Sequence, residues 1–242
     1  MSLLGHAAIA MWWDISPERK VEFEDWHSHE HLPERLSIAG FRRGSRWAAA
    51  DGGPGFFVLY ELAAHDTLSS PEYLERLNRP TPWSTQLMPH HRHMVRSQCR
   101  VVASVGAGIA RGMLTLRLSP RAPDRGALRA YLIEQAGRIA ARPGTTAAHL
   151  LHTEAPDIAL TTEQRIRGGR DPSADWIFLA GGYDLAALQA LRGGDLSDRE
   201  LSRHGAADPV QAGVYVLSHA LASPEAPGRP APTVNEDGPA GV

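Results

Sequence analysis

The alternation of apolar and polar residues divides the first half of the chain into six elements. In order they are a strand over 6–15, a helix over 16–35, strands over 40–53 and 55–64, a helical region over 69–91 and a strand over 95–106. Ser16 and Pro17 favour a helix start, because Ser can cap the first turn and Pro is tolerated there. Pro33 is expected to end or kink this helix. The order βαββαβ is typical of a ferredoxin-like unit.

The second half repeats this order about 100 residues later, so each copy is a whole small unit rather than a short solenoid repeat. Its elements are a strand over 112–120, a helix over 124–142, strands over 144–155 and 175–184, a broken helix over 185–205 and a strand over 212–221. The connection over 156–175 is longer than most. It is expected to be a lid, an edge cover or a mobile loop.

The fold class predicted from this repeat is α+β, with two tandem ferredoxin-like βαββαβ units packed sheet to sheet. The units are assigned to residues 1–107 and 108–222. Residues 223–242 are rich in Pro, Ala and Gly, which predicts a disordered tail. A single unit would leave one apolar face of its sheet uncovered, and the second copy can cover it within the same chain.

Composition narrows the classes of function. The 242 residues carry 25 basic and 27 acidic side chains, so the net charge is 25 − 27 = −2 and neither nucleic acid nor an anionic membrane is an expected partner. The single Cys excludes an internal disulfide. No apolar run reaches the roughly 20 residues needed to span a bilayer. We therefore expect a cytoplasmic protein without membrane association.

The segment FEDWHSHEHLPER carries three His within five residues. On a helix His27 and His31 share one face, whereas His29 projects roughly 200° away from His27. A His pair at this spacing can bind zinc only if another element brings a third ligand. The segment also lacks the His-Glu-x-x-His order of zinc proteases. Metal binding therefore depends on residues elsewhere in the chain.

Acid–base catalysis suits the same pair, since imidazole gains and loses a proton near neutral pH. We predict His31 and His27 as catalytic residues, with Glu30 between them on the helical wheel as a third. The alternative is a solvated helix end without chemistry. His90, His91 and His93 follow Pro89. They can be explained by the helix dipole, or one of them can complete a His cluster with the pair.

Aromatic residues are the candidates for a substrate-binding wall. Trp12 and Trp13 must point to opposite faces of their strand. We predict Trp13, Trp26, Tyr60 and Trp83 as substrate-binding residues, against the alternative that they only pack in the core.

The stretch FEDWHSHEHLPERLSIAGFRRG resembles the dimeric α/β-barrel superfamily and, within it, the EthD-like group. The matching residues are Trp26, His27, His31, Leu32, Pro33, Gly40 and Phe41. The resemblance covers residues 1–106 through this motif and residues 111–221 through element order alone. It implies an intramolecular barrel with a pocket between the helices and the sheet of a unit, often with a His near the end of the first helix.

The hypothesis that follows is a small-molecule enzyme of the isomerase or lyase type. It would use His acid–base chemistry without a cofactor or metal to isomerise, eliminate or cyclise a small apolar substrate. One alternative is a metal- or haem-dependent lyase or oxygenase on the same fold, and another is a non-catalytic small-molecule binding or stress-related module. The chain is expected to be a monomer with an internal pseudo-dimer, or a homodimer.

Overall fold

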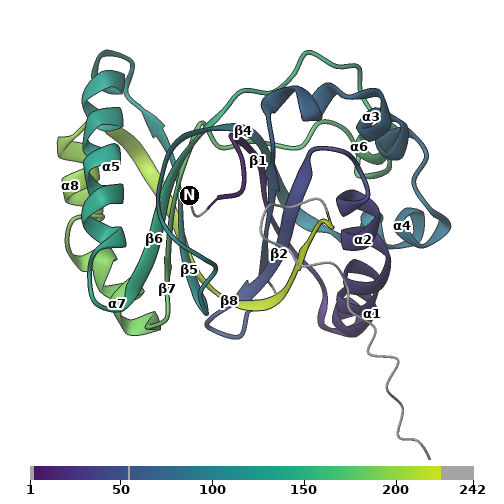
Figure 1. The fold of residues 1–242 in the computed structure, drawn as a ribbon, viewed down its shortest axis with the longest axis horizontal. Coiled ribbons are helices and arrows are strands. Elements are labelled where there is room, and N and C mark those ends of the chain that lie inside the picture. The colour runs from purple at the N-terminus through teal and green to yellow at the C-terminus, as the bar shows by residue number, and fades with distance from the viewer. Residues whose placement is uncertain (1–2, 54, 225–242) are drawn as a thin grey trace, which may run out of the picture.

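The computed structural model, which describes residues 3–53 and 55–224, contains a closed antiparallel barrel (Figure 1). Its strands are β1 Ala7–Asp14, β2 Phe41–Ala49, β3 Gly55–Leu62, β4 Arg92–Gly106, β5 Gly112–Pro120, β6 Thr145–Thr153, β7 Trp176–Gly182 and β8 Ala206–Ala222. They follow one another around the barrel as β1-β3-β2-β8-β5-β7-β6-β4. The predicted tandem fold and the intramolecular dimeric α/β barrel are confirmed.

Each half of the barrel has the strand order of a ferredoxin-like unit. The first half runs β4-β1-β3-β2 and the second runs β8-β5-β7-β6, so the two halves are equivalent strand for strand. The halves face each other across the lumen and are hydrogen-bonded along both edges, β2 to β8 and β4 to β6. Closure in this way leaves the sheet no free edge.

The helices cover the outside of the barrel on two opposite sides (Figure 1). The first unit carries α1 Lys20–Trp26, α2 Leu32–Leu36, α3 Pro71–Asn78 and α4 Pro82–Leu87, and the second carries α5 Arg125–Ala140, α7 Leu185–Ala190 and α8 Asp198–Arg203. Three apolar cores result, one under each helical layer and one inside the lumen. Trp13 belongs to the first helical core and Trp12 to the lumen, on opposite faces of β1.

The first helix does not end at Pro33. Between α1 and α2 the chain forms a π-helical turn over His27–His31, and α2 then carries Pro33 in its first turn. Proline is tolerated in a first turn because its missing N–H would have no helical partner there. A π turn is rare and is found mostly at functional sites. Its residues are rotated relative to those of a regular helix, which alters where Glu30 and His31 point.

The long connection over 156–175 is named here the lid segment. It leaves the second unit and crosses to the first (Figure 1), where its helix α6 Thr162–Ile166 packs against α3. The backbone N–H of Thr162 donates to Asn78 Oδ1 at 3.1 Å. Near the end of the segment, the Arg96 N–H donates to the carbonyl of Pro172 at 2.8 Å. The segment therefore covers part of the other unit.

The chain between the units is short, since β4 ends at Gly106 and β5 begins at Gly112. Of the tail predicted to be disordered, residues 225–242 lie outside the described residues. None of the described helices combines the length and the apolar character needed to cross a membrane.

Candidate functional site

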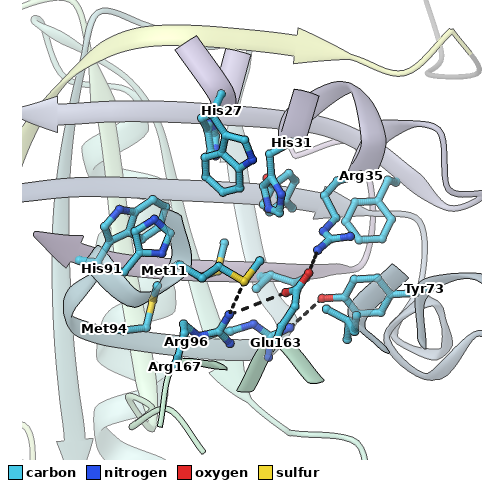
Figure 2. A pocket seen from close by; sticks show the side chains of 17 residues that line it. Met11, His27, His31, Arg35, Tyr73, His91, Met94, Arg96, Glu163 and Arg167 are labelled. Atoms are coloured by element: carbon cyan, nitrogen blue, oxygen red, sulfur yellow. Dashed lines mark hydrogen bonds and ion pairs between the residues drawn. The ribbon is translucent and has the colours of Figure 1, made fainter. Parts of the chain in front are cut away.

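A cavity lies between the outer face of β1, β2, β3 and β4, the helices of the first unit and the lid segment (Figure 2). Its volume is about 40 Å³. Ile9, Phe41 and Leu77 form part of its apolar wall.

Two of the three His in the opening motif line this cavity. His27 is 1% exposed and His31 is 9% exposed, and their ring centroids are 5.7 Å apart. His29 lies in solvent with its side chain 74% exposed, and its Nδ1 contacts Asp25 Oδ1 at 2.8 Å. The helix therefore presents a pair of imidazoles to the cavity, and the third imidazole faces away.

His91, at the end of the second helical region, also lines this cavity. The His91 ring lies 5.2 Å from the Trp13 ring and 5.9 Å from the Trp26 ring. His93 turns outward and contacts Asp14 Oδ2 at 2.8 Å. Within residues 3–53 and 55–224, however, no three His, Cys, Asp or Glu side chains come together as a group that could hold a metal ion.

Several buried polar atoms around the cavity have no hydrogen-bond partner among the described residues. They are Trp13 Nε1, both ring nitrogens of His27 and of His91, His31 Nδ1 and Tyr60 Oη. Buried polar atoms are normally hydrogen-bonded, and leaving one without a partner costs about 1–3 kcal/mol. Seven such atoms belong to residues that line this one cavity.

Burial sets the protonation of these imidazoles. It lowers the pKa of His27 and His31 well below the usual value, with a further contribution from Arg46 at His27 and from Arg35 at His31. Burial, with Arg167 next in size, lowers the pKa of His91 to about 3. All three rings are therefore neutral at pH 7, and each keeps one nitrogen able to accept a proton.

The other end of the cavity carries charged side chains from both units (Figure 2). Arg35 of α2 forms a buried ion pair with Glu163 of α6. The second Glu163 oxygen lies 3.7 Å from Arg167 Nη1, and Arg167 is also bonded to Asp171 at 2.7 and 3.1 Å. The sequence interpretation missed Arg35, Glu163 and Arg167. Position 35 was accessible to it, since it follows His31 by four residues on one helix face.

Glu30 does not line the cavity. Its carboxylate accepts hydrogen bonds from Trp26 Nε1 at 3.1 Å and from Thr81 Oγ1 at 2.5 Å, with Ser84 Oγ at 3.5 Å. It thereby ties the first helix to the start of α4 and holds the Trp26 indole. That indole is stacked on the His31 ring with centroids 4.4 Å apart.

Of the predicted wall residues, Trp13, Trp26 and Tyr60 line the cavity, and Trp83 packs against the outer part of the core without reaching it. Met11, Met88 and Met94 complete the wall. Three of the five Met of the chain thus surround one small space. Methionine side chains are flexible, so this wall can reshape around a ligand.

No protein-family model matches the chain, and no curated protein sequence matches it. Solved structures do. A structure described as an anthrone oxidase-like protein aligns with a TM-score of 0.63 and 13% identity over 91% of this chain and 94% of its own. A candidate monooxygenase from Fusobacterium nucleatum aligns with a TM-score of 0.59 and 4% identity, covering 89% and 94%. A candidate monooxygenase from Lactobacillus acidophilus aligns with a TM-score of 0.54 and 8% identity, over 90% of this chain and 97% of its own.

These likenesses extend over nearly the whole of each pair of chains, so they include both units and the way the units are joined. At such low identity they establish the fold and leave the chemistry to the site.

Proposed function

We propose that the cavity of the first unit is the active site of an enzyme acting on a small, largely apolar molecule with an acidic hydrogen. The observation that carries the proposal is the set of neutral imidazoles of His27, His31 and His91, which line one cavity and carry buried ring nitrogens without hydrogen-bond partners among the described residues. Perturbed titratable groups in a cavity are typical of catalytic sites.

In the proposed reaction, His31 accepts a proton from a carbon or oxygen of the substrate and leaves an anion. His27 is the second proton-transfer group, since its ring lies 5.7 Å from that of His31, centroid to centroid. A substrate lying across both rings can lose a proton at one position and regain one at another. The result is an isomerisation, an elimination or a cyclisation that consumes no cofactor and changes no net proton count.

The surroundings favour rapid return of the proton. The same burial that lowers the pKa of His27 and His31 makes the imidazolium a strong acid once formed. An anion next to the ring opposes this effect, because an opposite charge within about 4–6 Å stabilises the protonated form. The proton is therefore held only while the anionic intermediate is present.

A second candidate is an oxygenase, favoured by the fold neighbours described as anthrone oxidase-like and as candidate monooxygenases. It begins with the same proton removal. The electron pair of the carbanion then passes to O₂, a C–O bond forms, and the imidazolium returns its proton to the peroxide oxygen. The His roles are the same in both candidates, and only the fate of the anion differs.

Exchange of a carbon-bound substrate hydrogen for deuterium in D₂O tests the shared step, because it reports removal of a proton from carbon whatever follows, whereas hydroxyl hydrogens exchange with water without an enzyme. A panel of enolisable and phenolic small molecules is screened by NMR with the wild-type protein, in air and without O₂. For any compound that exchanges, we expect His31→Ala to slow the exchange by about 10²–10⁴-fold. His29→Ala is the matched control, since His29 lies in solvent on the same turn, and it should exchange at the wild-type rate.

Exchange by His31→Ala at the wild-type rate would contradict the proposal. Binding of compounds without any exchange would favour the non-catalytic binding module instead. Oxygen uptake with a compound that exchanges would identify the oxygenase.

A further inference from the structure

Arg96 differs from the other cations on the cavity wall. Arg35 lies within 4 Å of the carboxylates of Glu34 and Glu163, and Arg167 lies as close to those of Glu163 and Asp171. Arg96, on β4, has no carboxylate within that distance in the described part of the chain. Its side-chain partner there is the hydroxyl of Tyr73, to which Nη2 donates at 2.7 Å. The guanidinium therefore faces the cavity as a cation without a counter-ion.

The position of this guanidinium is fixed by its neighbours. Tyr73 is buried in α3 at 2% exposure and holds one of the guanidinium N–H groups. The backbone N–H of Arg96 donates a hydrogen bond to the carbonyl of Pro172 in the lid segment. A substitution of the Arg96 side chain leaves this bond in place. An arginine offers five N–H donors in a planar fork, and four remain for a ligand. Figure 2 shows Arg96 across the cavity from His27 and His31.

We propose that Arg96 binds an anionic oxygen of the substrate, so that the ligand class is a small ring compound with a carboxylate or with an acidic phenol or enol. The inference rests on the proposed function, which places the substrate in this cavity. The imidazoles and indoles contact the ring, and the fork of Arg96 takes the oxygen in a charge-assisted hydrogen bond. Arginine suits such a contact better than lysine, since its fork matches a two-oxygen anion.

The two sources of the anionic oxygen make different use of Arg96. A carboxylate is already charged when it binds, so Arg96 contributes equally before and during the reaction and acts on affinity. A phenol or enol becomes charged only as His31 takes its proton, so Arg96 then stabilises the developing charge and acts on rate. In both cases Arg96 determines specificity and opposes the binding of neutral analogues, because they leave its charge without a partner.

Binding of matched probes tests the proposal without requiring turnover. Dissociation constants are measured by calorimetry for benzoate against benzamide, and for 4-nitrophenolate against 4-nitroanisole. In the wild-type protein we expect the ionised member of at least one pair to bind about tenfold or more tightly than the neutral member. Arg96→Gln should remove this preference, because it deletes the charge-assisted contact with the ionised members and the unpaired charge that opposes the neutral members.

Two further variants make the result specific. Tyr73→Phe removes the hydroxyl partner of the guanidinium, so its preference for the ionised probe should lie between those of the wild type and Arg96→Gln. This variant keeps the test valid if Arg96→Gln does not fold. Arg100→Gln is the matched control on the same strand. Arg100 is exposed and paired with Glu154 at 2.7 Å outside the cavity, so the preference should be unchanged.

If only benzoate binds more tightly than its neutral partner, Arg96 binds a carboxylate substituent of the substrate. If only 4-nitrophenolate does, Arg96 binds the phenol or enol oxygen that loses its proton in the reaction. Equal binding of ionised and neutral probes to the wild type, no binding of either ionised probe, or a preference that survives Arg96→Gln and Tyr73→Phe overturns the inference. Such a result leaves the proposed proton transfer intact, because deuterium exchange measures it separately.

Discussion

Glu163 and Arg35 lie 128 positions apart in the sequence and form an ion pair in which both side chains are almost completely buried. Arg35 belongs to α2, which directly follows the π-helical turn that carries His27 and His31, and Glu163 belongs to the lid segment of the second unit. The contact closes the charged end of the cavity. The second unit therefore supplies part of the candidate site as well as half of the barrel.

Loss of either partner of this ion pair should destabilise the protein strongly. Arg35→Met or Glu163→Leu alone removes the nearest counter-charge of a buried group and leaves only a longer contact, from Glu163 to Arg167 at 3.7 Å or from Arg35 to Glu34 at 3.5 Å. We expect each single variant to lose up to about 3–5 kcal/mol in the free energy of unfolding. The double variant removes both charges and should recover much of this loss. Urea unfolding of the four proteins measures both effects.

The exposed ion pair between Arg79 and Glu75 is the matched control for this measurement. Glu75→Ala should change the free energy of unfolding by less than about 1 kcal/mol, because water screens an exposed pair. A Glu163→Leu variant as stable as Glu75→Ala would show that the lid is not fastened by this contact.

The free energy of unfolding should decrease as the pH is lowered below about 6.5, because of the buried histidines. The pKa of His91 is about 3 in the folded protein and about 6.5 in an unfolded chain, so between these values only the unfolded chain binds the proton. The contribution is fully present above pH 6.5 and is lost as the pH falls, by about 1.4 kcal/mol per pH unit. The lowered pKa values of His27 and His31 act in the same direction.

Denaturant unfolding at several pH values isolates this effect when His91→Gln is compared with the wild type. Carboxylates contribute equally in both proteins, so the difference in slope below pH 6.5 belongs to His91. Parallel curves for His91→Gln and the wild type would mean that His91 is protonated in the folded protein.

Glu30 should act through Trp26 and take no part in proton transfer. Glu30→Gln keeps an oxygen for Trp26 Nε1 and Thr81 Oγ1, so its rate of deuterium exchange should stay within about fivefold of wild type, with an unchanged pH profile. Glu30→Ala removes the acceptor and should lower stability by about 1–3 kcal/mol. A loss of about 10²-fold in Glu30→Gln, together with a shifted pH profile, would instead restore Glu30 as an acid–base group.

The alternation of apolar and polar residues predicts the fold, because both units bury alternate strand residues and one face of each helix. Closure of the barrel follows from the duplication, since each unit has a sheet face that only the other copy can cover. The pairing of His27 with His31 is also local, because four residues on a helix bring two side chains to one side.

Other features of the site depend on information that short-range periodicity does not carry. Glu30 was placed by a regular helical wheel, whereas the chain forms a π turn at His27–His31. Glu163 reaches Arg35 only through the three-dimensional path of a connection that has little regular structure. Such long-range contacts set the charges around the cavity, and a single sequence gives no signal for them beyond the unusual length of the connection.

The pairing of β2 with β8 also governs when the protein can form during synthesis. Trp47 of β2 is paired with Leu217 of β8. The ribosome therefore adds 217 − 47 = 170 residues after Trp47 before this partner has been synthesised. Through this interval one border of the first sheet has unpaired backbone groups, which can join to another nascent chain. Slow translation of the second half would prolong this exposure, and a chaperone that shields the edge of β2 would shorten it.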